Sequence, residues 1–247
     1  MDKEAYCLAY LLEDTGIEYC FVGELALQYY NVPRVVHDLE ICVPAKQLMK
    51  AVMCLTATGQ FESDTMENFN SYTEYKRGFA RLRSTAANLP SFTVIIFDDN
   101  SQCLNPLDKN TITSEELAAC QTFSSQVSDS LSVRSITSLK WPRLPSLLLG
   151  LCQRYLDNHD DVGLIGAEQL VDGMDLTKEW CDENLSHADS RALALAYSLI
   201  DGKGDRMDPF LENAVTCFIR SQSDAKMLRQ LPGYESNAVS ANCSKQS

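Results

Sequence analysis

One stretch near the N-terminus constrains this chain most: an apolar run that stops at a glycine and is followed by two closely spaced acids. Residues 20–22 are apolar, Gly23 interrupts them, and a short helical pattern continues to Tyr30. Asp38 and Glu40 then alternate with apolar neighbours, which predicts a strand with both carboxylates on one face. Two carboxylates at that distance repel each other unless a cation lies between them, and oxygen ligands of this kind suit Mg²⁺.

This layout resembles the nucleotidyltransferase signature of the DNA polymerase beta-like superfamily, hydrophobic-Gly-[Gly/Ser] followed by Asp-hydrophobic-[Asp/Glu]-hydrophobic. Here Val22-Gly23-Glu24 is followed, after thirteen residues, by Asp38-Leu39-Glu40-Ile41. The resemblance implies that Asp38 and Glu40 are catalytic residues that hold Mg²⁺ and that Gly23 faces the phosphates of a nucleotide. It extends over about the first quarter of the chain.

Two positions depart from the pattern of that family. Glu24 stands where the family has Gly or Ser, and its carboxylate would occupy or repel an anion at the start of the following helix, although the helix dipole favours it there. The third family acid is expected on a neighbouring strand, yet Phe92–Phe97 contains none, and Thr93 is its expected occupant. Without that acid, a ligand for a second metal and a base for the acceptor are both missing.

A basic patch follows the acid pair. The alternation of Tyr75–Ser84 predicts a strand with Arg77, Arg81 and Arg83 on one face, and Lys76 lies beside them. Arginine forks suit phosphate oxygens, so these side chains are candidate nucleotide contacts together with the turn at residues 23 and 24. The other interpretation is a solvated edge strand whose charges prevent pairing with another chain. The sequence leaves both open.

Arg34 and His37 lie just before the acid pair. A histidine titrates near neutral pH, so His37 is a candidate proton shuttle. The alternative is an ordinary surface residue at the start of a strand.

The secondary-structure pattern changes along the chain. We expect an α+β fold: a nucleotidyltransferase-like mixed sheet flanked by helices over residues 1–140, then a helical module over 141–230. Val133–Leu139 is expected to be the last strand of the sheet. Residues 231–247 are small and polar, which predicts a disordered tail. In the helical module, apolar spacing predicts helices over Ser146–Leu156, Val162–Val171, Leu176–Asn184, Ser190–Ile200 and Pro209–Ser221.

Composition narrows the expected partners. The formal net charge of −13 opposes general binding of DNA or RNA, because a strongly acidic protein repels phosphate backbones. The ten cysteines do not have metal-binding spacing, and no signal peptide or membrane-spanning run is evident. We therefore expect a reduced, cytoplasmic protein that does not associate with membranes.

Two functional hypotheses follow. In the first, the protein is an enzyme that uses Mg²⁺ to transfer a nucleoside monophosphate from an NTP to a small-molecule acceptor. In the second, the nucleotidyltransferase-like scaffold has lost this chemistry. It then binds a ligand or a partner, or performs a different, metal-free reaction in the same cleft. Glu24 and the acid-free strand over Phe92–Phe97 favour the second hypothesis.

Overall fold

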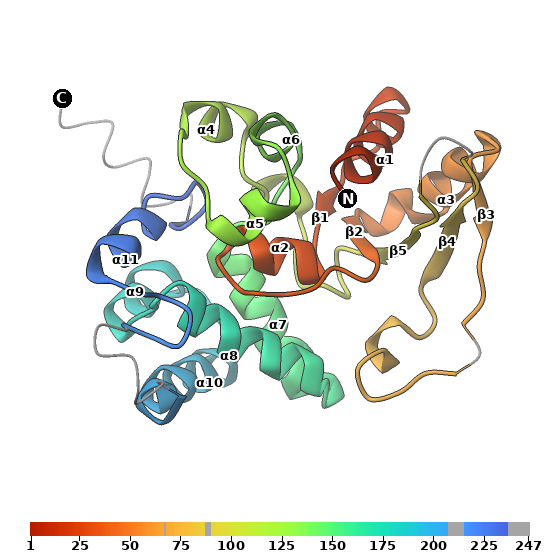
Figure 1. Cartoon of the computed structure of the whole chain (residues 1–247). Helices are drawn as coiled ribbons and strands as arrows, with labels where there is room; N and C mark the ends of the chain where they lie inside the picture. The colour runs from red at the N-terminus through yellow and green to blue at the C-terminus, as the bar shows by residue number, and fades with distance from the viewer. Residues whose placement is uncertain (67, 87–89, 207–214, 237–247) are drawn as a thin grey trace.

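The fold is built on a mixed five-stranded sheet (Figure 1). The computed structural model describes residues 1–66, 68–86, 90–206 and 215–236. Within them the strand order is β1-β2-β5-β4-β3, and β2 and β5 are the parallel pair among otherwise antiparallel neighbours. The strands are β1 (Cys20–Phe21), β2 (Leu39–Val43), β3 (Phe61–Ser63), β4 (Ala80–Ser84) and β5 (Thr93–Asp98).

Helices pack against the sheet and extend beyond it. α1 and α3 contact each other, and α3 also contacts β3 and β5, whereas α7, α8 and α10 pack together on the other side of α2 (Figure 1). The helices are α1 (Asp2–Asp14), α2 (Gly23–Tyr29), α3 (Leu48–Ala57), α4 (Ser114–Ala119), α5 (Ser125–Ser130), α6 (Val133–Ser138), α7 (Leu144–Asn158), α8 (Asp161–Gly173), α9 (Lys178–Asn184), α10 (Ser190–Asp201) and α11 (Gln222–Leu228). Short 3₁₀ turns cover Ala45–Gln47, Glu74–Lys76, Leu107–Lys109 and Gly202–Arg206. The expected α+β class, with a mixed sheet flanked by helices, is confirmed.

The two faces of β2 have different surroundings. Leu39, Ile41 and Val43 belong to the main hydrophobic core. Cys42, on the opposite face, packs in a smaller cluster with Ile95 and other residues around β5. Because side chains alternate along a strand, Glu40 lies on the same face as Cys42. The acid pair therefore borders the small cluster and not the main core.

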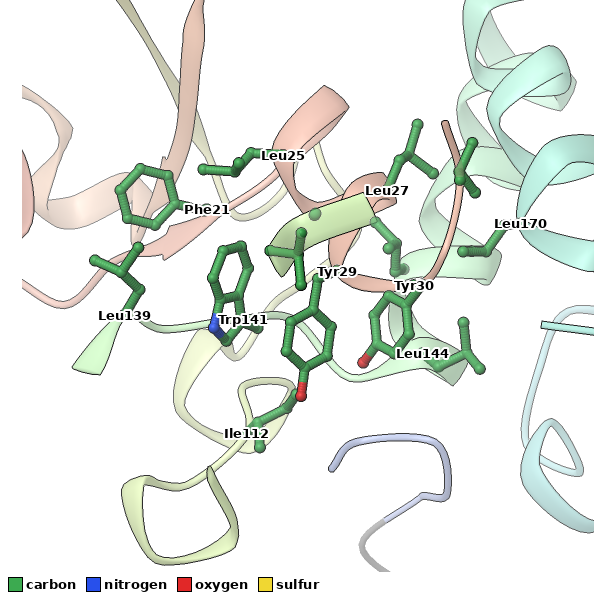
Figure 2. Packing of buried hydrophobic residues seen from close by; sticks show 14 of the residues in the cluster. Phe21, Leu25, Leu27, Tyr29, Tyr30, Ile112, Leu139, Trp141, Leu144 and Leu170 are labelled. Atoms are coloured by element: carbon green, nitrogen blue, oxygen red, sulfur yellow. The ribbon is translucent and has the colours of Figure 1, made fainter. Parts of the chain in front are cut away.

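The main core continues without interruption from the sheet into the helices. Trp141 is fully buried at the expected domain boundary, and its ring stacks on Tyr29 with a centroid distance of 5.0 Å (Figure 2). Its indole N–H donates to the carbonyl of Ile136, and the hydroxyl of Tyr30 donates to the carbonyl of Pro142. Residues 141–145 are thus a packed seam between the two expected modules.

Two local expectations are wrong. Val133–Leu139 was expected to be a strand, but Val133–Ser138 is helix α6, which begins where the Ser132 side chain accepts a hydrogen bond from the backbone N–H of Ser135. That cap satisfies a free donor of the first turn and outweighs the β-branched residues that favour a strand. The strand expected from Tyr75 begins only at Ala80, because Glu74–Lys76 forms a 3₁₀ turn.

The start of the expected tail is ordered. Leu231 and Tyr234 are buried, and the carbonyls of Gly233 and Tyr234 accept hydrogen bonds from Leu144 and Trp180. The expectation of disorder is therefore wrong for residues 231–236, and residues 237–247 lie outside the described part of the chain. A helix was also expected over Pro209–Ser221. Residues 209–214 lie outside the described part of the chain, and within 215–219 Thr216 and Ile219 form an isolated β-bridge instead of a helix.

Candidate functional site

The glycine bend after β1 touches the second acid of the pair. Gly23 has a φ of +61°, and a Cβ placed on it would lie 2.0 Å from Oε2 of Glu40. The backbone N–H of Val22 donates to the carbonyl of Glu40 at 2.9 Å, so backbone pairing holds the two segments together. Only a residue without a side chain fits at this bend, both because of its left-handed φ and because of the carboxylate opposite.

Glu40 of β2 and Asp38, the residue just before β2, face the same side and share one cation. The Nζ atom of Lys76 lies 2.9 Å from Oδ2 of Asp38 and 2.8 Å from Oε1 of Glu40. The three side chains are largely buried, at 6%, 14% and 1% exposure respectively. The predicted geometry is therefore present, and the cation between the carboxylates is an ammonium group from the 3₁₀ turn at Glu74–Lys76.

Electrostatics stabilise the charged form of this lysine. Burial lowers the pKa of Lys76, but the carboxylates of Glu40 and Asp38 outweigh it and hold the pKa above its usual value. Tyr75 adds a hydroxyl that donates to Oε1 of Glu40 at 2.5 Å. Burial and the Glu40 carboxylate raise the pKa of Tyr75, so its hydroxyl remains a donor throughout the neutral range.

Arg81 connects Asp38 to the next strand. Its guanidinium lies 3.4 Å from Oδ2 of Asp38, donates to Asp64 at 2.8 Å and donates to Thr93 Oγ1 at 3.3 Å. Since Leu39 of β2 pairs with Val94 of the parallel strand β5, Asp38, just before β2, lies beside Thr93. Thr93 thus occupies the place expected for a third acid, and Arg81 bridges it to the first.

This arrangement does not fit Mg²⁺. Magnesium requires about six oxygen ligands in near-octahedral geometry. Here the ammonium of Lys76 lies between the carboxylates of Asp38 and Glu40. The position expected for a third acid carries the hydroxyl of Thr93. Across the described residues no group of three or more His, Cys, Asp or Glu side chains is placed to hold a metal ion.

Glu24 points to the loop between α2 and β2. Its Oε2 accepts from the backbone N–H of His37 at 2.7 Å, and its Oε1 lies 2.9 Å from Nδ1 of the same residue. His37 is itself 71% exposed at the edge of the site. Glu24 therefore fixes the loop that leads into Asp38.

Two of the predicted arginine contacts lie elsewhere. Arg77 pairs with Glu74, and Arg83 pairs with Glu62, in both cases on the exposed surface. The prediction placed Arg77 on a strand, but that strand starts after it. Of the three arginines, only Arg81 reaches the acid pair.

A cavity of about 410 Å³ opens beside the acid pair. Among its residues that the sequence did not point to are Tyr75 and Arg154. Arg154 comes from the buried side of α7, where a lone arginine among apolar residues was the signal that could have indicated it. Its guanidinium donates to Asp160 and Gln102 and lies over the ring of Tyr75. The lining is formed by Gly23, Glu24, Leu27, Arg34, His37, Asp38, Glu40, Tyr72, Thr73, Tyr75, Lys76, Leu151, Arg154 and Val162.

The fold and site together define an α+β protein with a buried Asp-Glu-Lys cluster beside a strand-to-helix glycine. No protein-family model matches the chain, and no curated protein matches it. Among solved structures, it is similar to an antigenic nucleotidyltransferase-like protein from Paracoccidioides brasiliensis, at 13% identity and a TM-score of 0.47, over 82% of this chain and 88% of that one. No helix in the described residues is both long and apolar enough to cross a membrane.

Proposed function

We propose that this chain is a ligand-binding protein of nucleotidyltransferase-like architecture in which a lysine takes the place of a metal ion. The observation that supports the proposal is the position of Lys76, whose ammonium lies within 3 Å of both Asp38 and Glu40. Like a metal ion, the ammonium relieves the repulsion between two carboxylates on one strand. Unlike a metal ion, an ammonium cannot act as a Lewis acid toward a phosphate or an attacking group.

Displacing this lysine would be costly. Lys76 and Glu40 are both buried, and leaving one member of a buried ion pair without its partner costs about 3–5 kcal/mol. A divalent cation would have to offset that cost with two carboxylates as its protein ligands. The cavity beside the cluster remains available for a ligand, and its volume falls within the range of small-molecule sites, roughly 300–1,000 Å³.

The second candidate is the Mg²⁺-dependent transfer of a nucleoside monophosphate from an NTP to a small-molecule acceptor. One observation favours it: Asp38 and Glu40 share a side, and Glu40 meets the bend at Gly23 that the family signature contains. It requires Lys76 to leave the acid pair. It also requires catalysis without a third acid, since Thr93 stands at that position.

Thermal unfolding with added nucleotides separates the two candidates. Each of ATP, GTP, CTP and UTP would be added at millimolar concentration, with and without MgCl₂. A ligand that binds only the folded state must raise the melting temperature. The first proposal predicts no rise that depends on both NTP and Mg²⁺.

The matched control is Asp38→Ala under the same conditions. A rise in the wild-type protein that needs both NTP and Mg²⁺, and that disappears in Asp38→Ala, would refute the first proposal and support transfer chemistry. A direct assay for released pyrophosphate with a mixture of small hydroxyl acceptors provides an independent readout of the same alternative.

A further inference from the structure

Arg34 is the cation in the cavity lining that has no acidic partner. Its Nε is buried and makes no hydrogen bond within the described residues, and no ion pair forms on its guanidinium there. The rest of the side chain is only partly buried, so its terminal nitrogens can reach a ligand. The loop backbone around it is held in place, because the side-chain amide of Gln28 donates to the Arg34 carbonyl at 2.5 Å.

The other cations of the same lining already have partners. Lys76 binds Asp38 and Glu40, and Arg154 donates to Asp160 and Gln102. One guanidinium is therefore available to a ligand, which matches a single anionic group. The three acids of the lining disfavour a polyanion, because each would repel additional negative charge.

The remaining walls suit an apolar body. Leu27, Leu151 and Val162 line the cavity, and the rings of Tyr72 and Tyr75 border it. Apolar and aromatic walls with a few placed polar groups are typical of small-molecule sites. Guanidinium groups bind carboxylates and phosphates through paired N–H donors, which the two terminal nitrogens of the partly buried Arg34 would supply.

From these contacts we infer that the cavity binds a small organic anion, with one carboxylate or phosphate-monoester group on Arg34 and an apolar body against Leu27, Leu151 and Val162. The inference deepens the proposed function and rests on it, in that Lys76 stays between Asp38 and Glu40 and leaves Arg34 as the free cation. Arg34 acts here as a binding residue and takes no part in any chemical step.

Titration with model anions tests this inference. Phenyl phosphate and 3-phenylpropionate would be titrated into the wild-type protein by calorimetry, with inorganic phosphate and the neutral 3-phenylpropanol as comparisons. At least one aromatic anion should bind, and more tightly than either comparison compound. The two anions also distinguish a phosphate from a carboxylate as the preferred group.

Variants then locate the binding. Arg34→Gln should raise the Kd for the preferred anion by about tenfold or more, because losing a hydrogen bond to a charged group lowers the affinity by at least that factor. Arg83→Gln, which removes an exposed arginine paired with Glu62, should leave the Kd unchanged. Val162→Trp should block binding by filling the cavity, and it keeps the test decisive if Arg34→Gln does not fold.

Three results would overturn the inference: neither aromatic anion binds, Arg34→Gln or Val162→Trp binds as well as the wild type, or Arg83→Gln loses as much affinity as Arg34→Gln. Failure of the proposed function has a different signature. In that case NTP and Mg²⁺ together stabilise the wild-type protein but not Asp38→Ala. That measurement uses no aromatic anion and no Arg34 variant, so the two failures can be told apart.

Discussion

Gly23 and Glu40 meet with no room for a side chain between them. The Cβ of any other residue at position 23 would lie 2.0 Å from Oε2 and 2.6 Å from the carboxyl carbon of Glu40. Glu40 cannot easily move aside, because its other oxygen is bound by Lys76 and Tyr75. The glycine of the sequence signature thus has a steric role in holding the carboxylate of β2 in position.

Gly23→Ala should therefore destabilise the protein by more than its backbone conformation alone explains. Gly16 provides the matched control, since its φ of +65° is similar but nothing lies within 4 Å of an added Cβ. A non-glycine residue in the left-handed region costs on the order of 1 kcal/mol, which is the expected loss for Gly16→Ala. Gly23→Ala should lose about 1–3 kcal/mol more through displacement of Glu40. Urea unfolding measures both, and equal losses would contradict the steric role.

Lys76→Met should strongly lower the free energy of unfolding. The substitution leaves Glu40 without its cation and Asp38 with only the more distant guanidinium of Arg81, which is expected to cost about 3–5 kcal/mol. Adding Glu40→Gln to Lys76→Met should recover part of the loss, because one of the repelling charges is removed. Arg83→Gln, at an exposed ion pair, should change the stability little. If Lys76→Met unfolds at the same urea concentration as the wild type, the ion cluster is not a structural element.

Removing the lysine should also make the acid pair responsive to divalent cations. In Lys76→Ala the two carboxylates lose their cation and a small volume opens between them, so MgCl₂ should raise the melting temperature of this variant. The wild type should show a smaller rise or none, because its ammonium already lies there. A cation that binds only the folded state acts by mass action, so the rise should grow with MgCl₂ concentration. An equal response of both proteins would mean that Lys76 does not exclude the metal.

The sequence was enough to predict that Asp38 and Glu40 lie on one face of a strand, but not which cation lies between them. Alternation along β2 places Asp38 and Glu40 on one side, and the glycine at the end of an apolar run indicates the bend that meets them. The partner of these acids comes from a 3₁₀ turn in a long connection, where no periodic pattern fixes the direction of a side chain. From the sequence, Lys76 is therefore grouped with the arginines in a basic patch that is either a nucleotide contact or a solvated edge strand.

The predicted positions of the arginines differ from those in the structure for a related reason. Assigning strand periodicity from Tyr75 onward put Arg77 in register with Arg81, whereas the strand starts at Ala80. Arg81 and Arg83 are correctly on one face of β4, but the sheet order decides their partners. Arg81 reaches across β5 to Asp38, just before β2, and Arg83 pairs with Glu62 of β3. Sheet order depends on contacts between distant segments, and local sequence patterns do not encode it.

Tyr75 should make the protein less stable at high pH. Burial and the Glu40 carboxylate raise the pKa of Tyr75 in the folded state, while the unfolded chain ionises near pH 10. Below pH 10 the hydroxyl is protonated in both states, and its stabilising contribution is fully present. Above pH 10 the unfolded chain releases this proton and the folded chain keeps it, so stability falls by about 1.4 kcal/mol per pH unit.

Tyr75→Phe should remove that contribution. The variant should be less stable than the wild type at pH 8, because Glu40 loses a hydrogen-bond donor. Between pH 10 and about pH 11, its free energy of unfolding should decline less steeply than that of the wild type. The difference in slope should approach about 1.4 kcal/mol per pH unit, which corresponds to one proton. Parallel declines in urea-unfolding series would show that the Tyr75 hydroxyl titrates normally.

The packed seam around Trp141 predicts that the sheet and the helical module unfold together. Trp141 is fully buried against Tyr29 of α2 and Phe21 of β1, so both modules contribute to one core. Trp141→Ala should lower the free energy of unfolding by about 3–5 kcal/mol, and the transition should remain a single step by both circular dichroism and tryptophan fluorescence from Trp180. A fragment of residues 1–140 should show no cooperative transition, because the surfaces of Tyr29 and Tyr30 that pack on residues 141–144 would be exposed to water. A sharp transition of that fragment, or two separate steps in the full chain, would instead mean that the two modules fold independently.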